Sequence, residues 1–468
     1  MTPAQRRVLL VAILASFVSF LDGTVVNVAL PAIADELAGG ALGGLALQQW
    51  VVDAYLITLG SLILVAGSLS DVHGRRRVMW WGLLGFAVTS VLCALAPTGV
   101  FLVVARGLQG VAGALLVPSS LAMIISAFSG AAQAKAIGTW TAWTGTAMIA
   151  GPLLGGVLVD TLSWRWVFGI NLLPVAVTLW ILHGMEEGDT ATGRRIDVRG
   201  AVLAAVGLAG PVFALIEHGR FGWASPVVWV PLAVGVAALV AFLGWERRAP
   251  DPMLPLSLFS VRNFAAGNVA TAAIYGALAF GGFAVTLFVQ QVAGYSATLA
   301  GLALLPVTLL MLFLSSRFGA LAGRYGPRLF MTVGPLIAGC GYLLMLTTTA
   351  EASYFTQLLP GILLFGLGLA ITVAPLTAAI LGSIPAADAG IGSAVNNAVS
   401  RIAGLVVIAC AGIVIGPVLD VAGFHRALIV TAALLVAGGL VSWAGIRNEQ
   451  VVAAGVADAS AGADAAEA

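Results

Sequence analysis

Fourteen long apolar segments make up most of this chain, and they constrain its fold more than any other feature. A helix rises about 1.5 Å per residue, so about 20 apolar residues cross a hydrocarbon layer of roughly 30 Å. Each segment is close to that length or longer, and we expect fourteen membrane-spanning helices. Their approximate positions are residues 8–33, 48–70, 78–97, 99–126, 137–159, 165–184, 199–217, 226–245, 264–290, 298–318, 328–348, 354–381, 392–418 and 425–446.

The composition agrees with a membrane protein and excludes several other classes. Of the 468 residues, 60% are hydrophobic and only 9% are charged, and the mean hydropathy is +1.06, whereas soluble domains carry about 25% charged residues. The expected fold class is therefore an all-α polytopic membrane protein. A net charge of +1 gives no electrostatic basis for binding nucleic acid. The three cysteines lie inside apolar segments, which favours packing over a disulfide framework.

Basic residues predict how the chain is oriented. If the N-terminus is cytoplasmic, 16 of the 21 Lys and Arg residues fall in cytoplasmic segments and only three in outer loops. This bias places both termini in the cytoplasm and supports an even number of helices. Arg6 and Arg7 precede the first apolar segment as they would in a signal peptide, but that segment continues to Pro31 without a convincing cleavage site. We therefore expect an uncleaved first helix.

A glycine-rich, charged turn occurs twice in the chain. Residues 67–77 (GSLSDVHGRRR) and residues 319–328 (GALAGRYGPR) match at two glycines, a leucine and an arginine with a constant offset of 252 residues (319 − 67). The repeat predicts two halves derived from one ancestral unit, with two extra helices between them. The expected domains are residues 1–184, an inserted helix pair at 185–263, residues 264–446, and a disordered cytoplasmic tail at 447–468.

Three charged residues lie inside the apolar segments at similar predicted depths. Asp22 should be about 21 Å above the cytoplasmic edge of the first helix, and Arg106 about 10 Å below the outer edge of the fourth. Asp53, near the outer end of the second helix, lies within a turn or two of the same level. Buried charges cost at least about 2.5–3.5 kcal/mol each unless they are paired or hydrated. We therefore expect an Asp/Arg/Asp cluster in which Asp22 exchanges a proton with water.

Structural roles remain open for the same two acids. Asp22 could instead brace Asn27 or a helix backbone. Asp53 could be a solvated residue in the first turns of its helix.

Five motifs follow one another along the chain. They are Leu21–Pro31 (LDGTVVNVALP), Gly67–Arg77, Arg106–Gly110 (RGLQG), Gly145–Gly156 (GTAMIAGPLLGG) and Trp164–Pro174 (WRWVFGINLLP). Together they resemble the major facilitator superfamily and, within it, the fourteen-helix drug/proton antiporter family. The resemblance spans residues 8 to 446. It implies two six-helix bundles plus two inserted helices, and proton-coupled export by alternating access, with Gln109 of the third motif beside the Asp22 and Arg106 site.

The resemblance assigns a role to the first turn. In the family this turn is a gating contact between the two halves on the cytoplasmic side. Its residues here are Gly67, Asp71, Gly74, Arg75 and Arg76. Small residues would let the second helix approach a neighbour closely, and Asp71 could accept from a helix N-terminus or pair with an arginine. A plain topogenic turn is the alternative, and the second copy has Gly323 where Asp71 stands.

The fifth helix carries the motif that the family associates with export by antiport. Its residues are Gly145, Gly151, Pro152, Gly155 and Gly156. The glycines allow close helix packing and the proline removes an intrahelical hydrogen bond, so the helix could bend and seal the outer side in one state. A static packing kink is the alternative.

The substrate cavity is the least specified part of the prediction. Candidate lining residues are Asn27, Trp143, Tyr275 and Asn396, although lipid-facing or packing roles fit them equally well. We expect Arg401 to extend toward the cytoplasmic end of its helix and not to contact substrate.

Taken together, these features predict a proton-coupled antiporter that exports small amphipathic compounds, with proton-coupled uptake as the alternative. An ATP-driven pump is disfavoured because the only lysine, Lys135, lies outside any phosphate-binding loop. An enzyme is disfavoured because no histidine pair has metal-ligand spacing, and we expect no metal. A channel fits the repeat less well than alternating access does. We expect a monomer in the bacterial plasma membrane with no cofactor, using small molecules, protons and the lipid bilayer as partners.

Overall fold

The computed structural model describes residues 1–39, 42–185, 196–385 and 388–448. Within these residues, 14 helices are long and apolar enough to cross a membrane, and each overlaps one of the predicted segments. The expected all-α polytopic class is therefore confirmed. The predicted tail, from residue 449 on, lies outside the described residues.

The first spans are α1 (Pro3–Leu37), α2 (Gly44–His73), α3 (Arg75–Ala94), α4 (Gly99–Ala127), α5 (Gly130–Thr161), and α6 (Trp166–Gly169) followed by α7 (Leu172–His183). The next two are α8 (Val198–Phe221) and α9 (Pro226–Glu246). The remaining spans are α10 (Arg262–Leu287), α11 (Ala297–Ala303) with α12 (Leu305–Tyr325), α13 (Pro327–Leu344), α14 (Leu359–Leu381), α15 (Ala389–Ala409) with α16 (Ala411–Ile415), and α17 (Val421–Gly445). Single turns η1 (Leu256–Ser260), η2 (Phe288–Val292), η3 (Met345–Thr347) and η4 (Tyr354–Leu358) adjoin them.

Local sequence explains where several helices begin. Thr2 caps α1 by accepting from the backbone N–H of Gln5, whose side chain accepts in turn from the N–H of Thr2, and Pro3 occupies the first helical position. Asp420 caps α17 through the N–H of Gly423. These side chains satisfy N–H groups that have no partner within the helix.

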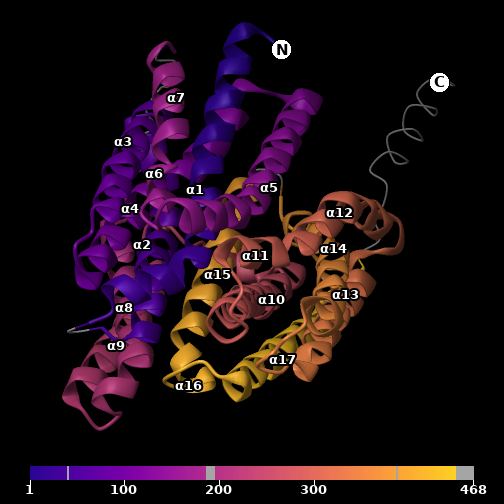
Figure 1. Cartoon of the computed structure of the whole chain (residues 1–468). Coiled ribbons are helices and arrows are strands. Elements are labelled where there is room, and N and C mark those ends of the chain that lie inside the picture. Colours follow the sequence, from indigo (N-terminus) through magenta and orange to yellow (C-terminus); the bar gives the residue numbers. More distant parts are fainter. Residues whose placement is uncertain (40–41, 186–195, 386–387, 449–468) are drawn as a thin grey trace, which may run out of the picture.

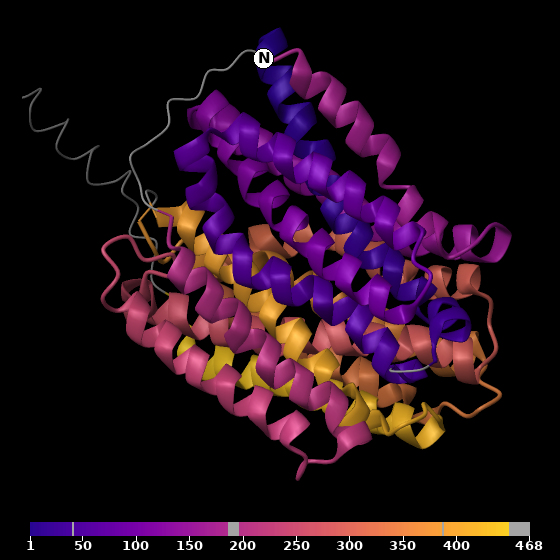
Figure 2. The same ribbon diagram turned by 90° about the vertical axis from the view of Figure 1, so that its left-hand side faces the viewer.

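The helices form two groups with a hairpin beside them (Figure 1). We call α1–α7 the first group and α10–α17 the second group. They occupy opposite parts of the molecule, as the indigo-to-magenta and orange-to-yellow colours show. The hairpin of α8 and α9 packs on itself, and α8 also lies against α2 of the first group and α15 of the second. Figure 2 shows this hairpin running alongside both groups.

The repeated turn has the same backbone geometry in both copies. Gly74 between α2 and α3 has φ 88°, and Gly326 between α12 and α13 has φ 85°. A residue with a Cβ is strained at these angles, so each turn requires glycine. The offset found in the sequence therefore matches equivalent turns in the structure.

The ends of the helices define two faces. Arg7 at the start of α1 donates to the carbonyl of Gly184 after α7, and Asn263 at the start of α10 donates to the carbonyl of Arg447 after α17. We call the face that holds these ends and the α2–α3 turn the terminal face. The opposite face, which holds the α1–α2 and α5–α6 connections, is the distal face.

Hydrogen bonds join the two groups at three places near the distal face. Gln290 after α10 donates to the carbonyl of Val28 on α1 at 3.2 Å. Gln49 of α2 donates to the carbonyls of Ile408 and Ala409 on α15 at 2.8 and 3.0 Å. The third place lies between α5 and α11, and it is formed by the side chain of Asp160 accepting from backbone N–H groups.

The glycines of α5 are also packed more tightly toward the distal face than toward the terminal face. Gly138 and Gly145, toward the terminal face, have no atom within 4 Å of where a Cβ would lie. Gly156, toward the distal face, packs against the backbone of Ala297 and Thr298 from the second group. The two groups are therefore tightly joined at the distal face, while the terminal half of α5 has open space at its glycines.

Candidate charge-coupling site between the helices

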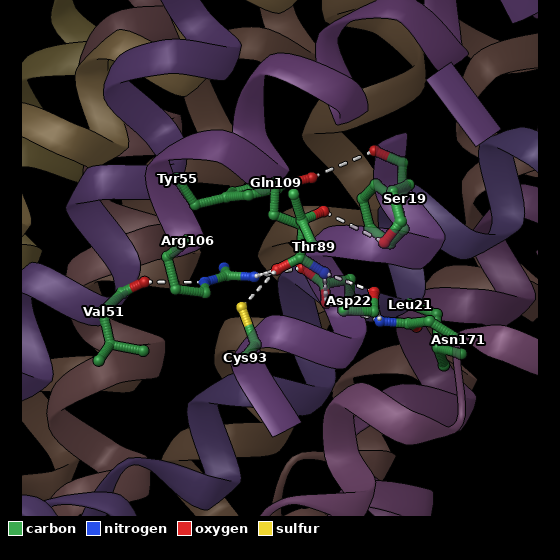
Figure 3. A network of polar contacts seen from close by, with 12 residues as sticks. Ser19, Leu21, Asp22, Val51, Tyr55, Thr89, Cys93, Arg106, Gln109 and Asn171 are labelled. Atoms are coloured by element: carbon green, nitrogen blue, oxygen red, sulfur yellow. Dashed lines mark hydrogen bonds and ion pairs between the residues drawn. The ribbon is translucent and has the colours of Figure 1, made fainter. Parts of the chain in front are cut away.

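A buried ion pair lies at the centre of the first group (Figure 3). Nη1 of Arg106 on α4 lies 2.6 Å from Oδ2 of Asp22 on α1, and the two side chains are 2% and 0% exposed. The predicted meeting of these two residues is confirmed. The two residues meet because α1 and α4 run in opposite directions and carry their charges at the same depth.

Asp22 accepts from two further side chains. Gln109, one turn after Arg106 on α4, donates to Oδ1 at 3.1 Å, and Asn171 at the start of α7 donates to the same atom at 2.9 Å. Gln109 also accepts from Nη1 of Arg106 at 2.7 Å and donates to Ser90 of α3 at 2.9 Å. The carboxylate is thus held by donors from α4 and from the α6–α7 junction (Figure 3).

The guanidinium is held on its other sides as well. Nε of Arg106 donates to the carbonyl of Val51 on α2 at 3.0 Å. The rings of Tyr55 and Phe168 flank the guanidinium carbon, with centroids at 4.3 and 5.7 Å. Aromatic faces stabilise a cation at these distances. A buried ion pair is stable only with such extra partners, because desolvation of two charges offsets most of their attraction.

The network therefore links α1, α4 and the start of α7 through the Asp22 carboxylate. It reaches α2 through Arg106 and α3 through Gln109. The expected alternative, in which Asp22 braces Asn27, is wrong in that detail, since the partners of Asp22 are Arg106, Gln109 and Asn171. Asn171 and Ser90 were missed by the sequence reasoning. Asn171 stands inside the fifth motif, and an amide in an apolar segment level with Asp22 was the available signal.

Asp53 does not join this network, contrary to the expected Asp/Arg/Asp cluster. Its side chain is 0% exposed, and neither carboxylate oxygen has a hydrogen-bond partner among the described residues. The expected alternative of a solvated helix start is also wrong, because α2 begins at Gly44 and buries this position. Gln49, one turn before Asp53 on the same side of α2, donates to backbone carbonyls of α15, whereas Tyr55, two residues after Asp53, faces Arg106. Asp53 therefore lies close to the second group, on another side of α2 from the Arg106 site.

Arg401 lies elsewhere than expected. Its guanidinium carbon is 5.3 Å from the ring centroid of Phe20 on α1, so the side chain crosses to the first group and does not extend to the end of α15. The distance from Arg401 to the helix end, on which the expectation rested, does not decide where the side chain goes. Its contact with α1 depends on how the two groups face each other.

The four candidate cavity residues differ in their surroundings, and their role in a substrate cavity stays a prediction. Asn396 donates to Asn268 and Thr271 at 3.2 and 2.9 Å, which ties α15 to α10 within the second group. Tyr275 and Asn27 are half-buried. Trp143 on α5 is 55% exposed.

The α2–α3 turn shows no close contact at its first glycine. A Cβ on Gly67 would meet nothing within 4 Å, so the expected close approach is wrong at this glycine. It does occur at Ser70 of the same motif, whose Oγ lies 2.7 Å from that of Ser119 on α4. Arg76 donates to the carbonyls of Leu182 and His183 at the end of α7, within the first group. The side chain of Asp71 lies outside the described part of the structure, and the predicted gating role stays a prediction.

The α5 motif packs as expected at three of its four glycines. Gly151 and Gly155 lie against Thr24 and Val25 of α1, and Gly156 lies against α11. The carbonyl of Pro152 lies against Gly301 of α11, where a Cβ would clash with it. Gly145 is the exception, because nothing packs on it.

Comparison with known proteins agrees with this architecture. A sequence profile of the Major Facilitator Superfamily matches residues 12–408. The chain is 35% identical over 407 residues to the multidrug resistance protein Stp of Mycobacterium tuberculosis, covering 85% of this chain and 73% of Stp. It is 35% identical over 407 residues to the puromycin resistance protein pur8 of Streptomyces alboniger, covering 85% and 79%. The crystal structure of an auto-inhibited POT family peptide transporter superposes with TM-score 0.69 at 16% identity, covering 96% and 98%.

In the part of the chain that the structure describes, two groups of apolar helices, the α8–α9 hairpin and a buried ion pair between helices are those of a polytopic membrane transporter. The chain belongs to the Major Facilitator Superfamily.

Proposed function

We propose that this transporter exports small amphipathic compounds across the bacterial plasma membrane in exchange for protons, with the proton gradient as its energy source. The names of its relatives support export of drugs, since Stp is a multidrug resistance protein and pur8 a puromycin resistance protein. The observation that carries the proton coupling is the Asp22–Arg106 pair, because an ionisable pair inside the membrane is costly to keep unless it serves transport.

The orientation follows from the basic residues. Placing the terminal face in the cytoplasm puts 16 of the 21 Lys and Arg residues in cytoplasmic segments. The joined distal face is then the outer one, and the structure corresponds to a state closed to the outside.

In this state the Asp22 carboxylate accepts hydrogen bonds from Arg106, Gln109 and Asn171. We place proton binding in the state that opens to the outside, where α1 and α4 separate enough for water to reach the carboxylate. A proton on Asp22 removes its negative charge, so Arg106 loses its counter-ion. When the outer side closes, Arg106 returns to Asp22 and displaces the proton, which leaves toward the cytoplasm. One proton therefore enters for each cycle of closing.

Closure of the outer side uses the contacts between α5 and α11. Gly156 and Gly301 let the two helices touch through their backbones, and Asp160 ties the end of α5 to the start of α11. These contacts must separate when the outer side opens. Glycines stand at this interface because they let the backbones of α5 and α11 approach closely in the closed state.

Purified protein in proteoliposomes tests the proposal. With tetraphenylphosphonium and carboxyfluorescein as probes, we expect an imposed pH gradient to drive probe movement against its own gradient and in the direction opposite to proton flow. Counterflow without a pH gradient would identify a carrier. Probe movement in the same direction as the protons would identify uptake by symport, and conductance that does not saturate would identify a channel.

A further inference from the structure

Arg401 lies at mid-membrane depth and faces the opposite helix group. It is near the middle of the span Ala389–Ile415, which has 27 residues. Its Nη1 lies 3.9 Å from where a Cβ on Gly23 would be, and its guanidinium stands over the ring of Phe20. Both contacts are on α1, so this side chain reaches across the space between the two groups.

No described residue neutralises the charge of Arg401. Arg401 forms neither an ion pair nor a hydrogen bond with any described residue, and its side chain is half-buried. A charge at this depth is costly unless it is paired or reaches water, and such residues mark substrate or ion pathways. The five N–H donors of Arg401 therefore lack an acceptor among the described residues.

The other charges at this depth are not available to Arg401. Asp22 is buried and bonded to Arg106, and Asp53 is buried without an ion-pair partner. Asp22, Asp53 and Arg106 are all buried, whereas Arg401 is partly exposed. The accessible charge between the groups is therefore positive.

Arg401 belongs to a polar face of α15. Ser393, Asn397 and Arg401 are spaced four residues apart, so they line one side of the helix. All three are half-buried. The Nδ2 of Asn397 donates to the carbonyl of Ser393 at 3.2 Å, and no described residue donates to its Oδ1. This face offers a cation and an amide next to the aromatic ring of Phe20.

We propose that Arg401 binds the anionic group of the transported compound, so that amphipathic anions bearing a carboxylate are substrates of this chain. The inference rests on the proposed export function and names its substrate class. Guanidinium and carboxylate match in geometry and form two parallel hydrogen bonds. The ring of Phe20, over which the guanidinium stands, receives the apolar part of the molecule. A lipophilic cation gains nothing from this site and is repelled by the guanidinium.

Direct binding tests the inference with two probes of opposite charge. Carboxyfluorescein as the anion and tetraphenylphosphonium as the cation are titrated onto purified protein in phosphatidylcholine nanodiscs, with fluorescence anisotropy and calorimetry as readouts. The variants are Arg401→Gln and Arg401→Lys. The control is Arg328→Gln, because Arg328 also stands over an aromatic ring in the second group but lies at the terminal face.

We expect Arg401→Gln to weaken carboxyfluorescein binding about tenfold or more, the value of a charge-assisted hydrogen bond. Arg401→Lys should lose less, because it keeps the charge but not the planar fork. Tetraphenylphosphonium binding should stay unchanged or tighten, and Arg328→Gln should bind both probes as the wild type does. Carboxyfluorescein binding that is absent, or unchanged in Arg401→Gln, would overturn the inference. An equal loss of both probes would overturn it too, since that result indicates misfolding or a non-ionic role.

Two further measurements identify the source of the anion and separate the anion site from the proposed export function. Nanodiscs containing phosphatidylglycerol test whether a lipid headgroup is the anion: unchanged dye affinity supports a soluble compound, and strong competition by the lipid overturns it. Transport of tetraphenylphosphonium driven by a pH gradient, together with Arg401-independent dye binding, would reject the anion site and keep the export function. Arg401-dependent dye binding without any driven transport would reject the export function and keep the site.

Discussion

Asp160 at the end of α5 accepts a hydrogen bond from the backbone N–H of Thr298 in α11 at 2.8 Å, and a second from the N–H of Ala297 at 3.1 Å. One carboxylate of the first group thereby holds two backbone N–H groups of the second group. It does so at the distal face, where the groups are joined, and beside Gly156, which packs on the same two residues. The link between the two groups is therefore partly electrostatic and partly a matter of backbone contact.

Replacing Asp160 by Ala should weaken the closed distal face. The variant loses two charge-assisted hydrogen bonds, each worth about 1.5–3 kcal/mol, so the population of molecules open at the distal face should rise at least about tenfold. Distances between spin labels on the ends of α5 and α11, measured by pulsed electron resonance, report this change directly.

Glu36→Gln is the matched control for that experiment. Glu36 accepts from Arg165 and Trp164 at the distal face, but all three belong to the first group. Its loss should leave the distances between groups unchanged. If both variants shift the distances alike, the link through Asp160 is not specific.

Gly156→Val should prevent the distal face from closing. A Cβ at Gly156 meets the backbone of Ala297 and Thr298, which cannot move aside as a side chain can. We expect transport to fall by a factor of ten or more while the protein still inserts in the membrane. Gly145→Ala on the same helix has open space and should transport normally, with stability equal to or about 1 kcal/mol above the wild type. Transport assays and thermal unfolding in detergent compare the two, and normal transport by Gly156→Val would contradict a close seam.

Asp22→Asn should abolish transport driven by a pH gradient, because an amide does not carry the proton. Counterflow of the probe, which needs no net proton movement, should persist in the folded fraction. Asp35→Asn, at the exposed end of the same helix, should behave as the wild type. Full pH-driven transport by Asp22→Asn would remove Asp22 from the coupling mechanism.

The same pair predicts a stability relationship. Asp22→Asn leaves Arg106 buried without its counter-ion, which should cost about 3–5 kcal/mol of unfolding free energy. The double variant Asp22→Asn with Arg106→Gln removes both charges and should be more stable than Asp22→Asn alone. Thermal unfolding of the four proteins in detergent measures this coupling. Additive effects would mean that the pair contributes little.

Asp53→Leu should behave in the opposite way from Asp22→Asn. In the described part of the structure no donor contacts either oxygen of Asp53, so the substitution removes a desolvated polar group without breaking a hydrogen bond. We expect the unfolding free energy to stay the same or rise by about 1–3 kcal/mol. A clear loss of stability in thermal unfolding would show that Asp53 has a partner in the folded protein.

Much of the fold and part of the site could be predicted from the sequence. Span positions depend on hydrophobicity along the chain, which is a local property, and each predicted segment overlaps a helix. The meeting of Asp22 and Arg106 followed from depth, because residue count converts to height in a straight helix.

Height alone does not say which way a side chain points around its helix. Asp53 lies near the level of Asp22, but it is on a side of α2 away from Arg106 and has no hydrogen-bond partner among the described residues. Asn171 donates to the Asp22 carboxylate, a contact that the sequence did not predict. The sequence by itself determined the class, the spans, the repeated turn and the depth of each charge, because these depend on neighbours along one chain. Only the tertiary structure decided the partners of Asp22, the isolation of Asp53 and the crossing of Arg401 to α1, because these depend on helix rotation and on how the two groups pack.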